Sequence, residues 1–208
     1  MYSELILFII IFVTIYFLFF NDNRIDYLAD NGLTYKIRNE GTEEIKKKKA
    51  NILSRLDKKS KNIVKYMFDN KLPTEDIANK TNSRFSNSVI GETPSGDKSA
   101  AYTQNKGNIY ICLITNDKFN DENDAFFVIL HELAHVMSDS YGHGDEFKKN
   151  FDFIVKLAVK LNLWKPKKYE EDNTDYCGVI VTSSPCMGDT CNKENLDHFY
   201  KESLLDYK

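Results

Sequence analysis

Three of the four histidines in the chain, His131, His135 and His143, lie within thirteen residues. His131 and His135 are four residues apart, so on a helix they share one face and their imidazoles can converge on one metal ion. Glu132 lies one step around the helix, where its carboxylate flanks an open coordination position. This His-Glu-x-x-His arrangement is typical of two zinc ligands and a general base. The spacing therefore predicts a Zn²⁺ site that activates water for hydrolysis of peptide bonds.

A catalytic zinc ion usually takes three protein ligands and leaves a fourth position for water. His143 is the predicted third ligand, because imidazole suits zinc and because Gly142 and Gly144 allow the backbone to turn back towards the metal. Tyr141 is a candidate for stabilising an oxyanion, although a hydroxyl packed in a turn fits the sequence at least as well. The acids that could replace His143 as the third ligand are Asp145, Glu146, Glu170 and Glu171.

The histidine cluster also has interpretations other than catalysis. A histidine on a buried helix can be a core residue that bonds to a carbonyl group. Three histidines around Glu132 would make a costly core, because buried ionisable groups need partners. A non-catalytic zinc-binding protein and a scaffold with a structural, four-ligand metal site are the two alternatives to an enzyme.

The segments 131–135 (HELAH) and 141–147 (YGHGDEF) resemble the SprT-like and WLM zinc metalloproteases. Those families carry H-E-x-x-H and a third histidine shortly after it, often in an H-G-x-x-F context. The metzincin pattern fits less well, because seven residues rather than five separate His135 from His143. The resemblance covers residues 100–165. It implies an α+β, zincin-like metalloprotease domain with a central His-Glu-x-x-His helix, a small antiparallel sheet and a polypeptide substrate.

The elements that must position the site follow from the periodicity of apolar residues. A helix capped by Asn120 or Asp121 should carry the first two histidines, and a second amphipathic helix is predicted at 145–164. A hairpin with its turn at 105–107 is predicted at 100–114. We expect its strand 108–114 to be the edge along which an extended substrate pairs. The core stripe of the site helix is Phe126, Leu130, Leu133 and Met137.

The rest of the chain is less informative about chemistry. Residues 43–69 predict an amphipathic helix, and its lysines at 46–49 are predicted to be solvated, with contact to acidic lipid headgroups as the alternative. Residues 71–99 predict a loop with one short helix, and a final strand is expected at 177–183. The predicted organisation is an anchor at 1–20, a stalk at 21–42, a helix and linker region at 43–99, a metallopeptidase core at 100–185 and a tail at 186–208.

Residues 5–20 form an apolar run that predicts a transmembrane helix in contact with a lipid bilayer. A helix of this length spans about 24 Å. A cleaved signal peptide is the alternative, but the run lacks a basic start and a small-residue cleavage site. Lysine and arginine residues follow the run and none precedes it. The positive-inside rule therefore predicts a single-pass protein with its C-terminal domain in the cytosol.

Composition excludes little beyond a nucleic-acid partner. The chain has 208 residues, of which 42% are apolar, and this is enough for one folded domain. The net charge of −3 does not mark a nucleic-acid binder, and no nucleic-acid module is present in the sequence. The excess of lysine over arginine and the many asparagines indicate an AT-rich genome, such as that of a large DNA virus.

The four cysteines, three of them within fifteen residues, do not define a cellular compartment. Unpaired thiols are predicted. A disulfide between Cys186 and Cys191 is the first alternative. A second zinc site completed by His198 is the other, although the C-x-x-C spacing is missing. The remaining cysteines are Cys112 and Cys177.

Overall fold

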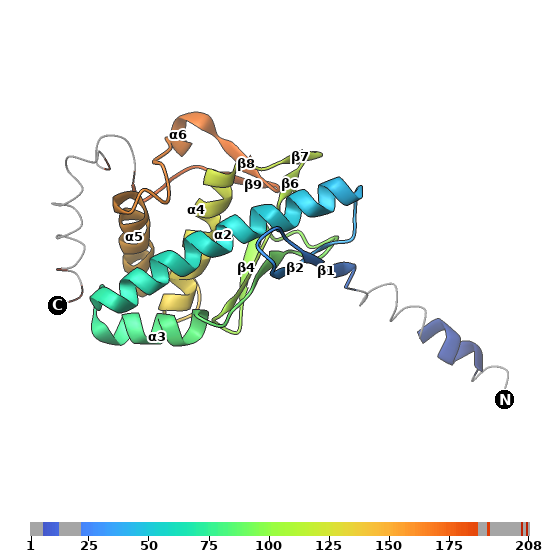
Figure 1. The fold of residues 1–208 in the computed structure, drawn as a ribbon, viewed down its shortest axis with the longest axis horizontal. Helices are drawn as coiled ribbons and strands as arrows, with labels where there is room; N and C mark the ends of the chain where they lie inside the picture. Colours follow the sequence, from blue (N-terminus) through green and yellow to red (C-terminus); the bar gives the residue numbers. More distant parts are fainter. Residues whose placement is uncertain (1–5, 13–21, 187–190, 192–204, 206, 208) are drawn as a thin grey trace.

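The computed structural model describes residues 6–12, 22–186, 191, 205 and 207 (Figure 1). The protein is α+β. Its labelled helices are α2 (Glu43–Asn70), α3 (Glu75–Phe85), α4 (Glu122–Met137), α5 (Asp145–Lys160) and α6 (Tyr169–Asp172). Its strands are β1 (Arg24–Leu28), β2 (Thr34–Arg38), β3 (Ile90–Glu92), β4 (Ala101–Gln104), β5 (Asn108–Ile111), β6 (Ile114–Thr115), β7 (Lys118–Phe119), β8 (Thr174–Tyr176) and β9 (Val179–Val181).

The sheet nearest the site helix has the strand order β3-β5-β4. Strands β4 and β5 form the predicted hairpin and pair antiparallel, with Thr103 opposite Ile109. Strand β3 joins β5 in parallel, so the sheet is mixed and not purely antiparallel as expected. The prediction that strand 108–114 is the edge for the substrate is also wrong, because β5 lies in the centre of the sheet and β4 lies at its edge.

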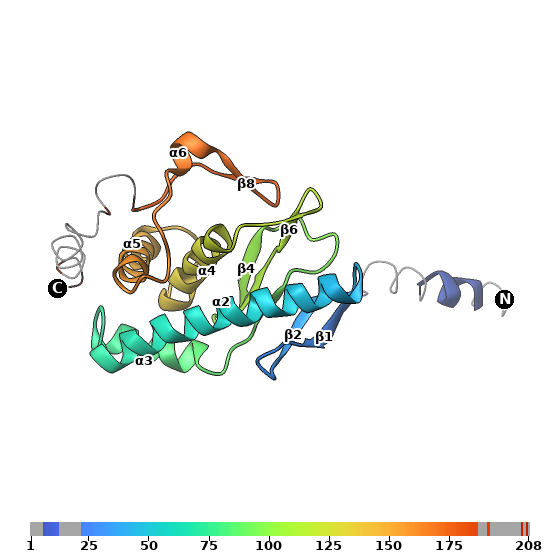
Figure 2. The ribbon, with the colours of Figure 1, turned by 45° about the horizontal axis from the view of Figure 1, so that its top comes forward.

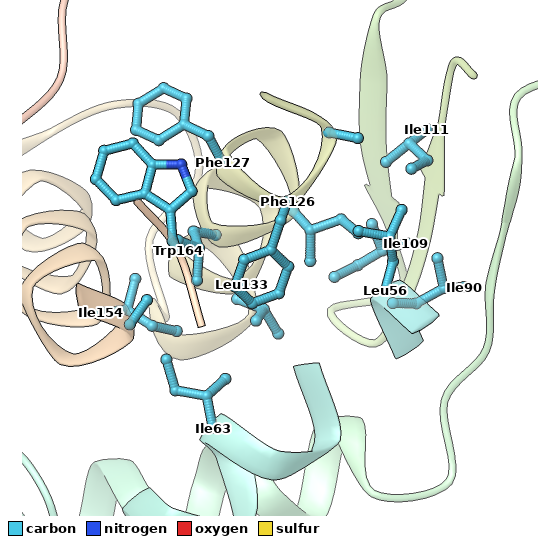
Figure 3. Close-up of a cluster of buried hydrophobic side chains, with 14 of the residues drawn as sticks. Leu56, Ile63, Ile90, Ile109, Ile111, Phe126, Phe127, Leu133, Ile154 and Trp164 are labelled. Carbon is cyan, nitrogen blue, oxygen red and sulfur yellow. The ribbon is translucent and has the colours of Figure 1, made fainter. Parts of the chain in front are cut away.

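Helix α4 lies in the middle of the hydrophobic core. Its predicted stripe is confirmed, since all four side chains are fully buried. Figure 3 shows Phe126 and Leu133 of α4 among side chains from α2, such as Leu56 and Ile63, and from β5, such as Ile109. On its other side α4 packs along α5, and the two helices lie next to each other in Figures 1 and 2. The core thus fixes which face of α4 remains open to solvent.

The predicted helix at 43–69 is confirmed as α2, which runs across the molecule (Figure 2). Residues 21–42 were expected to be a polar stalk, but they contain the antiparallel hairpin β1–β2. Tyr35 and Ile37 of this hairpin are buried. Only alternate residues of a strand face the core. The segment is therefore polar on average, although one face of the hairpin is apolar. One hydrophobic cluster extends from Ala29 to Cys191, across the expected boundaries after residues 42 and 99.

One lysine of the 46–49 run differs from the prediction of a solvated face. Lys49 is 1% exposed, and its Nζ lies 3.2 Å from Oε1 of Glu92, which is also fully buried. The backbone N–H of Arg38 donates to Oε2 of Glu92 at 2.7 Å. Burial raises the pKa of Glu92 above its ordinary value, while Lys49 and Arg38 oppose the shift. This buried ion pair joins α2 to β3.

The predicted N-terminal transmembrane helix is not supported. Of the predicted run, residues 6–12 are described and are helical. No helix among the described residues has the length and apolarity needed to cross a membrane. The prediction of a single-pass membrane protein therefore has no support from the described residues. The remaining residues of the predicted anchor, 1–5 and 13–20, lie outside it.

The cysteines form two disulfides, Cys112–Cys177 and Cys186–Cys191, so the prediction of unpaired thiols is wrong. The second pair is the alternative considered from the sequence. His198, which would have completed a second zinc site, lies outside the described residues. Cys112–Cys177 attaches the β8–β9 hairpin to the chain that leaves β5. Tyr176 strengthens this attachment, because its hydroxyl donates to the carbonyl of Cys112 at 2.7 Å.

Candidate metal centre

Helix α4 presents its histidines because its ends and its buried face are fixed. Asp121 is the N-cap, and its side chain accepts hydrogen bonds from the backbone N–H groups of Asn123 and Asp124. With the apolar stripe turned inwards, His131 and His135 lie on the half-exposed face. The helix ends at Met137, and Ser138 takes an extended conformation that starts the loop 138–144.

The loop 138–144 carries His143 back over the helix. Gly142 has a φ of +79°, which glycine adopts without the steric cost that other residues meet, as the sequence predicted. Gly144 has a φ of −68° and is the N-cap of α5, so its flexibility is not used in the same way. Glu146 fixes the start of the loop, because its carboxylate accepts hydrogen bonds from the backbone N–H groups of Asp139 at 2.7 Å and Ser140 at 2.9 Å.

Two cations fasten the same loop to neighbouring elements. The Lys106 ammonium, in the β4–β5 turn, donates to the carbonyls of His135, Ser138 and Ser140 at 3.3, 3.0 and 2.9 Å. Arg84 of α3 donates to the Ser138 carbonyl at 3.1 Å and to the Asp139 carboxylate at 2.8 Å. These contacts supply partners for the carbonyls at the end of α4, which have none within the helix. Neither role has a local signal in the sequence.

The three imidazoles converge at one point. Nε2 of His143 lies 3.0 Å from Nε2 of His131 and 3.2 Å from Nε2 of His135. Zinc–nitrogen bonds of about 2.0–2.1 Å in tetrahedral geometry separate ligand nitrogens by about 3.3 Å. The spacing of the three nitrogens therefore fits a zinc ion. These residues form the group of potential metal ligands found among the described residues.

The surroundings keep two of these imidazoles neutral, which is the form that binds metal. Burial lowers the pKa of His131 to about 3, and the neighbouring His135 and His143 add to the shift. Burial also lowers the pKa of His135 to about 4. The Phe147 ring packs against all three imidazoles, with ring centroids 4.8, 4.3 and 4.7 Å away. Phe147 therefore shields the rings and orients them together.

Glu132 is 6% exposed and stands beside the imidazoles without joining the ligand group. The hydroxyl of Thr103 on β4 donates to its Oε2 at 2.7 Å. Burial raises the pKa of the Glu132 carboxyl to about 7, although the bond from Thr103 opposes this shift. A carboxyl group with a pKa near neutrality can both accept and return a proton. Thr103 has no local signal in the sequence, because its partner lies 29 residues away.

The acids considered as rivals to His143 lie elsewhere or have other partners. Glu146 is engaged with the loop backbone, as described above, and Asp145 has a side chain that is 95% exposed. Glu171 pairs with Lys168 on α6. None of these acids, nor Glu170, belongs to the ligand group with the histidines among the described residues.

A cavity of about 510 Å³ lies above the histidines. Ala101, Tyr102 and Thr103 of β4 form one wall, so the edge strand runs alongside the site. Tyr141 lines the cavity but is 90% exposed, and its ring centroid lies 4.6 Å from Nζ of Lys106. Its assignment to an oxyanion stays a prediction. The arrangement provides three nitrogen ligands, a buried carboxylate and an accessible edge strand.

The fold and the site define an α+β protein with three convergent histidines in an accessible cavity. The chain is 31% identical over 142 residues to uncharacterized protein R325 of Acanthamoeba polyphaga mimivirus, covering 65% of this chain and 72% of that protein. The chain therefore belongs to the same family as the mimivirus protein.

Two further relatives are uncharacterized proteins of invertebrate iridescent viruses. Protein 042R of Invertebrate iridescent virus 3 is 33% identical over 81 residues, and protein 136R of Invertebrate iridescent virus 6 is 31% identical over 86 residues. Each match covers 38% of this chain, and the chain spans about half the length of these two proteins. No family model and no solved structure matches the chain. All three relatives are viral proteins, consistent with the viral origin that the composition indicated.

Proposed function

We propose that this protein is a zinc-dependent metallopeptidase that hydrolyses peptide bonds of a polypeptide substrate. The observation that carries the proposal is the convergence of three Nε2 atoms at 3.0 and 3.2 Å beside a buried carboxylate. The resemblance of segments 131–135 and 141–147 to the SprT-like and WLM zinc metalloproteases supports the same assignment.

The donor set fits a catalytic zinc ion better than a structural one. His131, His135 and His143 would hold the metal through three nitrogens. A structural zinc ion is closed by four protein ligands, whereas a catalytic one keeps a position for water. The ligand group among the described residues has three members and faces a cavity. This argues against the alternative of a purely structural metal site.

When bound, zinc lowers the pKa of water towards neutrality and polarises the carbonyl of the scissile peptide bond. Glu132 accepts the proton of the attacking water on its carboxylate and later delivers it to the leaving amine. Thr103 orients that carboxylate through the 2.7 Å hydrogen bond. The edge of β4 offers main-chain N–H and C=O groups with which an extended polypeptide can pair. Tyr141 remains the candidate for contact with the oxyanion.

The proposal is tested by incubating the zinc-loaded full chain with casein, an easily cleaved general substrate. We expect fragments from the wild type, none after chelation, and a rate about 10²–10⁴-fold lower in Glu132→Gln, because an amide cannot accept the proton. Glu132→Gln should retain its zinc. The matched control is Glu75→Gln, which makes the same change on α3 at a side chain that is 58% exposed and does not line the cavity above the histidines.

The outcomes separate the proposal from its alternative. Unchanged cleavage by purified Glu132→Gln would contradict the mechanism. A wild type that holds zinc and cleaves no polypeptide would instead support the non-catalytic zinc-binding protein.

A further inference from the structure

A second cavity adjoins the first and is apolar. It has a volume of about 610 Å³ and is lined by Ala101, Phe127, Val128, Phe147, Phe151 and strand β9, together with hydroxyl residues and the site itself. We call it the apolar groove. It shares Ala101, His131, Glu132 and His143 with the cavity above the histidines. A polypeptide bound beside the histidines would therefore reach the groove with a neighbouring side chain.

The floor of the groove is a set of packed aromatic rings. The ring centroid of Phe151 lies 5.5 Å from that of Phe127 and 5.6 Å from that of Phe147. The Phe151 ring also lies 5.2 Å from the ring of His131. The packed rings thus connect His131 to the groove. Val128 and Phe151 are partly exposed, so a ligand can contact them.

Strand β9 also lines the groove, and its Val179 and Ile180 are 49% and 52% exposed. Apolar side chains exposed to this extent on a short hairpin gain free energy when a ligand covers them. The disulfide Cys112–Cys177 and the Tyr176 hydroxyl fasten the hairpin at its other strand and turn. A second hydrogen bond, from the Cys177 N–H to Oγ1 of Thr115 at 2.9 Å, does the same. A wall that is already held in place loses less conformational entropy when a ligand binds.

Among the described residues, the groove offers no opposite charge to a charged side chain away from the site. The described lining includes no lysine, arginine or aspartate, and its polar residues outside the site are Ser99, Thr182 and Ser183. A charged side chain placed there would lose water without gaining an opposite charge, which is unfavourable. Its volume is in the range of cavities that hold small apolar ligands.

We propose that the apolar groove receives a bulky apolar side chain, aromatic or branched aliphatic, of the polypeptide residue next to the scissile bond. This inference rests on the proposed peptidase function and specifies the substrate class of that site. The occupant is part of the same extended segment that pairs with β4, because the groove and the histidine cavity are continuous at Ala101.

The first test measures binding and not cleavage. Fluorescent peptides of glycine, serine and alanine carry one central Phe, Leu or Asp and are titrated onto zinc-loaded Glu132→Gln. We expect the Phe and Leu peptides to bind about 10- to 100-fold more tightly than the Asp peptide, from the burial of one large apolar side chain. Equal affinities for the three peptides would overturn the proposal.

Two variants locate the preference in the groove. Ile180→Asp, added to Glu132→Gln, should bring the Phe-to-Asp affinity ratio close to one. Val89→Asp is the matched control, because Val89 is 50% exposed and does not line the groove. Val128→Phe narrows the groove and should shift the preference from Phe to a smaller apolar residue. A preference that survives both groove variants would also overturn the proposal.

Mapping the cleavage sites of the wild type in a proteome-derived peptide library separates this inference from the proposed function. Cleavage with a bulky apolar residue at one fixed position beside the cut supports both. Cleavage without such a preference contradicts the proposed role of the groove but supports the peptidase function. Peptide binding with the expected preference but no cleavage supports the groove and contradicts the peptidase.

Discussion

Thr103 and Glu132 join the edge strand to the site helix through a hydrogen bond of 2.7 Å from a hydroxyl to a carboxylate. The same hydroxyl lies 3.2 Å from the backbone carbonyl of Glu132. The strand that would align a substrate therefore also orients the proposed general base. Substrate position and proton transfer are coupled through this one side chain.

Thr103→Val keeps the side-chain shape and removes this bond. A hydrogen bond to a charged group contributes about 1.5–3 kcal/mol, so we expect kcat for peptide cleavage to fall roughly 10- to 100-fold. KM and zinc content should change little, because Thr103 is not a ligand. Thr103→Ser restores the hydroxyl and should recover most of kcat. A loss of zinc in Thr103→Val, or no rescue by serine, would show that Thr103 acts on the fold and not on Glu132.

The buried ion pair of Lys49 and Glu92 leads to a prediction about stability. Removing one partner of a buried pair typically costs about 3–5 kcal/mol, whereas replacing both with apolar residues is often close to neutral. We expect Lys49→Met to lower the free energy of unfolding by about that amount. Lys49→Met with Glu92→Leu should recover much of the loss. Denaturant titration of the three proteins at neutral pH measures this, and an additive double variant would contradict the coupling.

The same pair predicts a pH dependence. Burial raises the pKa of Glu92 in the folded protein above its ordinary value of 4.5. Between the unfolded and folded pKa values the folded state binds more protons, so this group stabilises the fold at low pH and loses that contribution as the pH rises. Lys49→Met removes an opposing cation and should raise the folded pKa further. The stability lost by Lys49→Met should therefore be smaller at pH 4.5 than at pH 7. An equal loss at both values would show that Glu92 does not titrate in this way.

Much of the candidate site could be predicted because its geometry is encoded locally. The spacing of His131 and His135, the cap at Asp121 and the buried stripe of α4 all follow from the helical period. The loop around Gly142 brings His143 back within a few residues, so the third nitrogen was also accessible to sequence reasoning. The sequence left open the choice between His143 and nearby acids as the third ligand. In the structure Nε2 of His143 lies beside the other two imidazoles, whereas Glu146 bonds to the loop backbone.

The features that sequence analysis missed depend on contacts between distant residues. Lys49 belongs to a run of lysines that looks solvated, and only the approach of Glu92 from β3 identifies it as buried. The pairing of Cys112 with Cys177 spans 65 residues, and several connectivities of four cysteines are equally compatible with the sequence. The N-terminal apolar run had the composition of a membrane span, but among the described residues no helix is long and apolar enough to form one.

The disulfide between Cys112 and Cys177 gives another stability prediction. It closes a loop with a sequence separation of 65 residues, and a loop of this size corresponds to about 4 kcal/mol in the chain-entropy description. We expect the Cys112→Ser, Cys177→Ser double variant to unfold at a lower denaturant concentration. Its free energy of unfolding should be about 2–4 kcal/mol below that of the wild type. Wild type in reductant should approach the variant, and the variant should not respond to reductant through this pair. Identical unfolding curves for wild type and variant would contradict a structural role for the bond.

Zinc binding by the full chain and its single variants tests the central claim most directly. Titration followed by metal analysis after gel filtration should give one zinc ion per wild-type chain, because three imidazoles converge on one point. Glu132→Gln and Glu146→Gln should keep that stoichiometry, whereas His131→Ala, His135→Ala and His143→Ala should each weaken binding strongly while the circular dichroism spectrum stays that of the wild type. Wild-type affinity in His143→Ala would place the third ligand elsewhere. Unchanged zinc content in all three histidine variants would contradict the metal centre and the peptidase built on it.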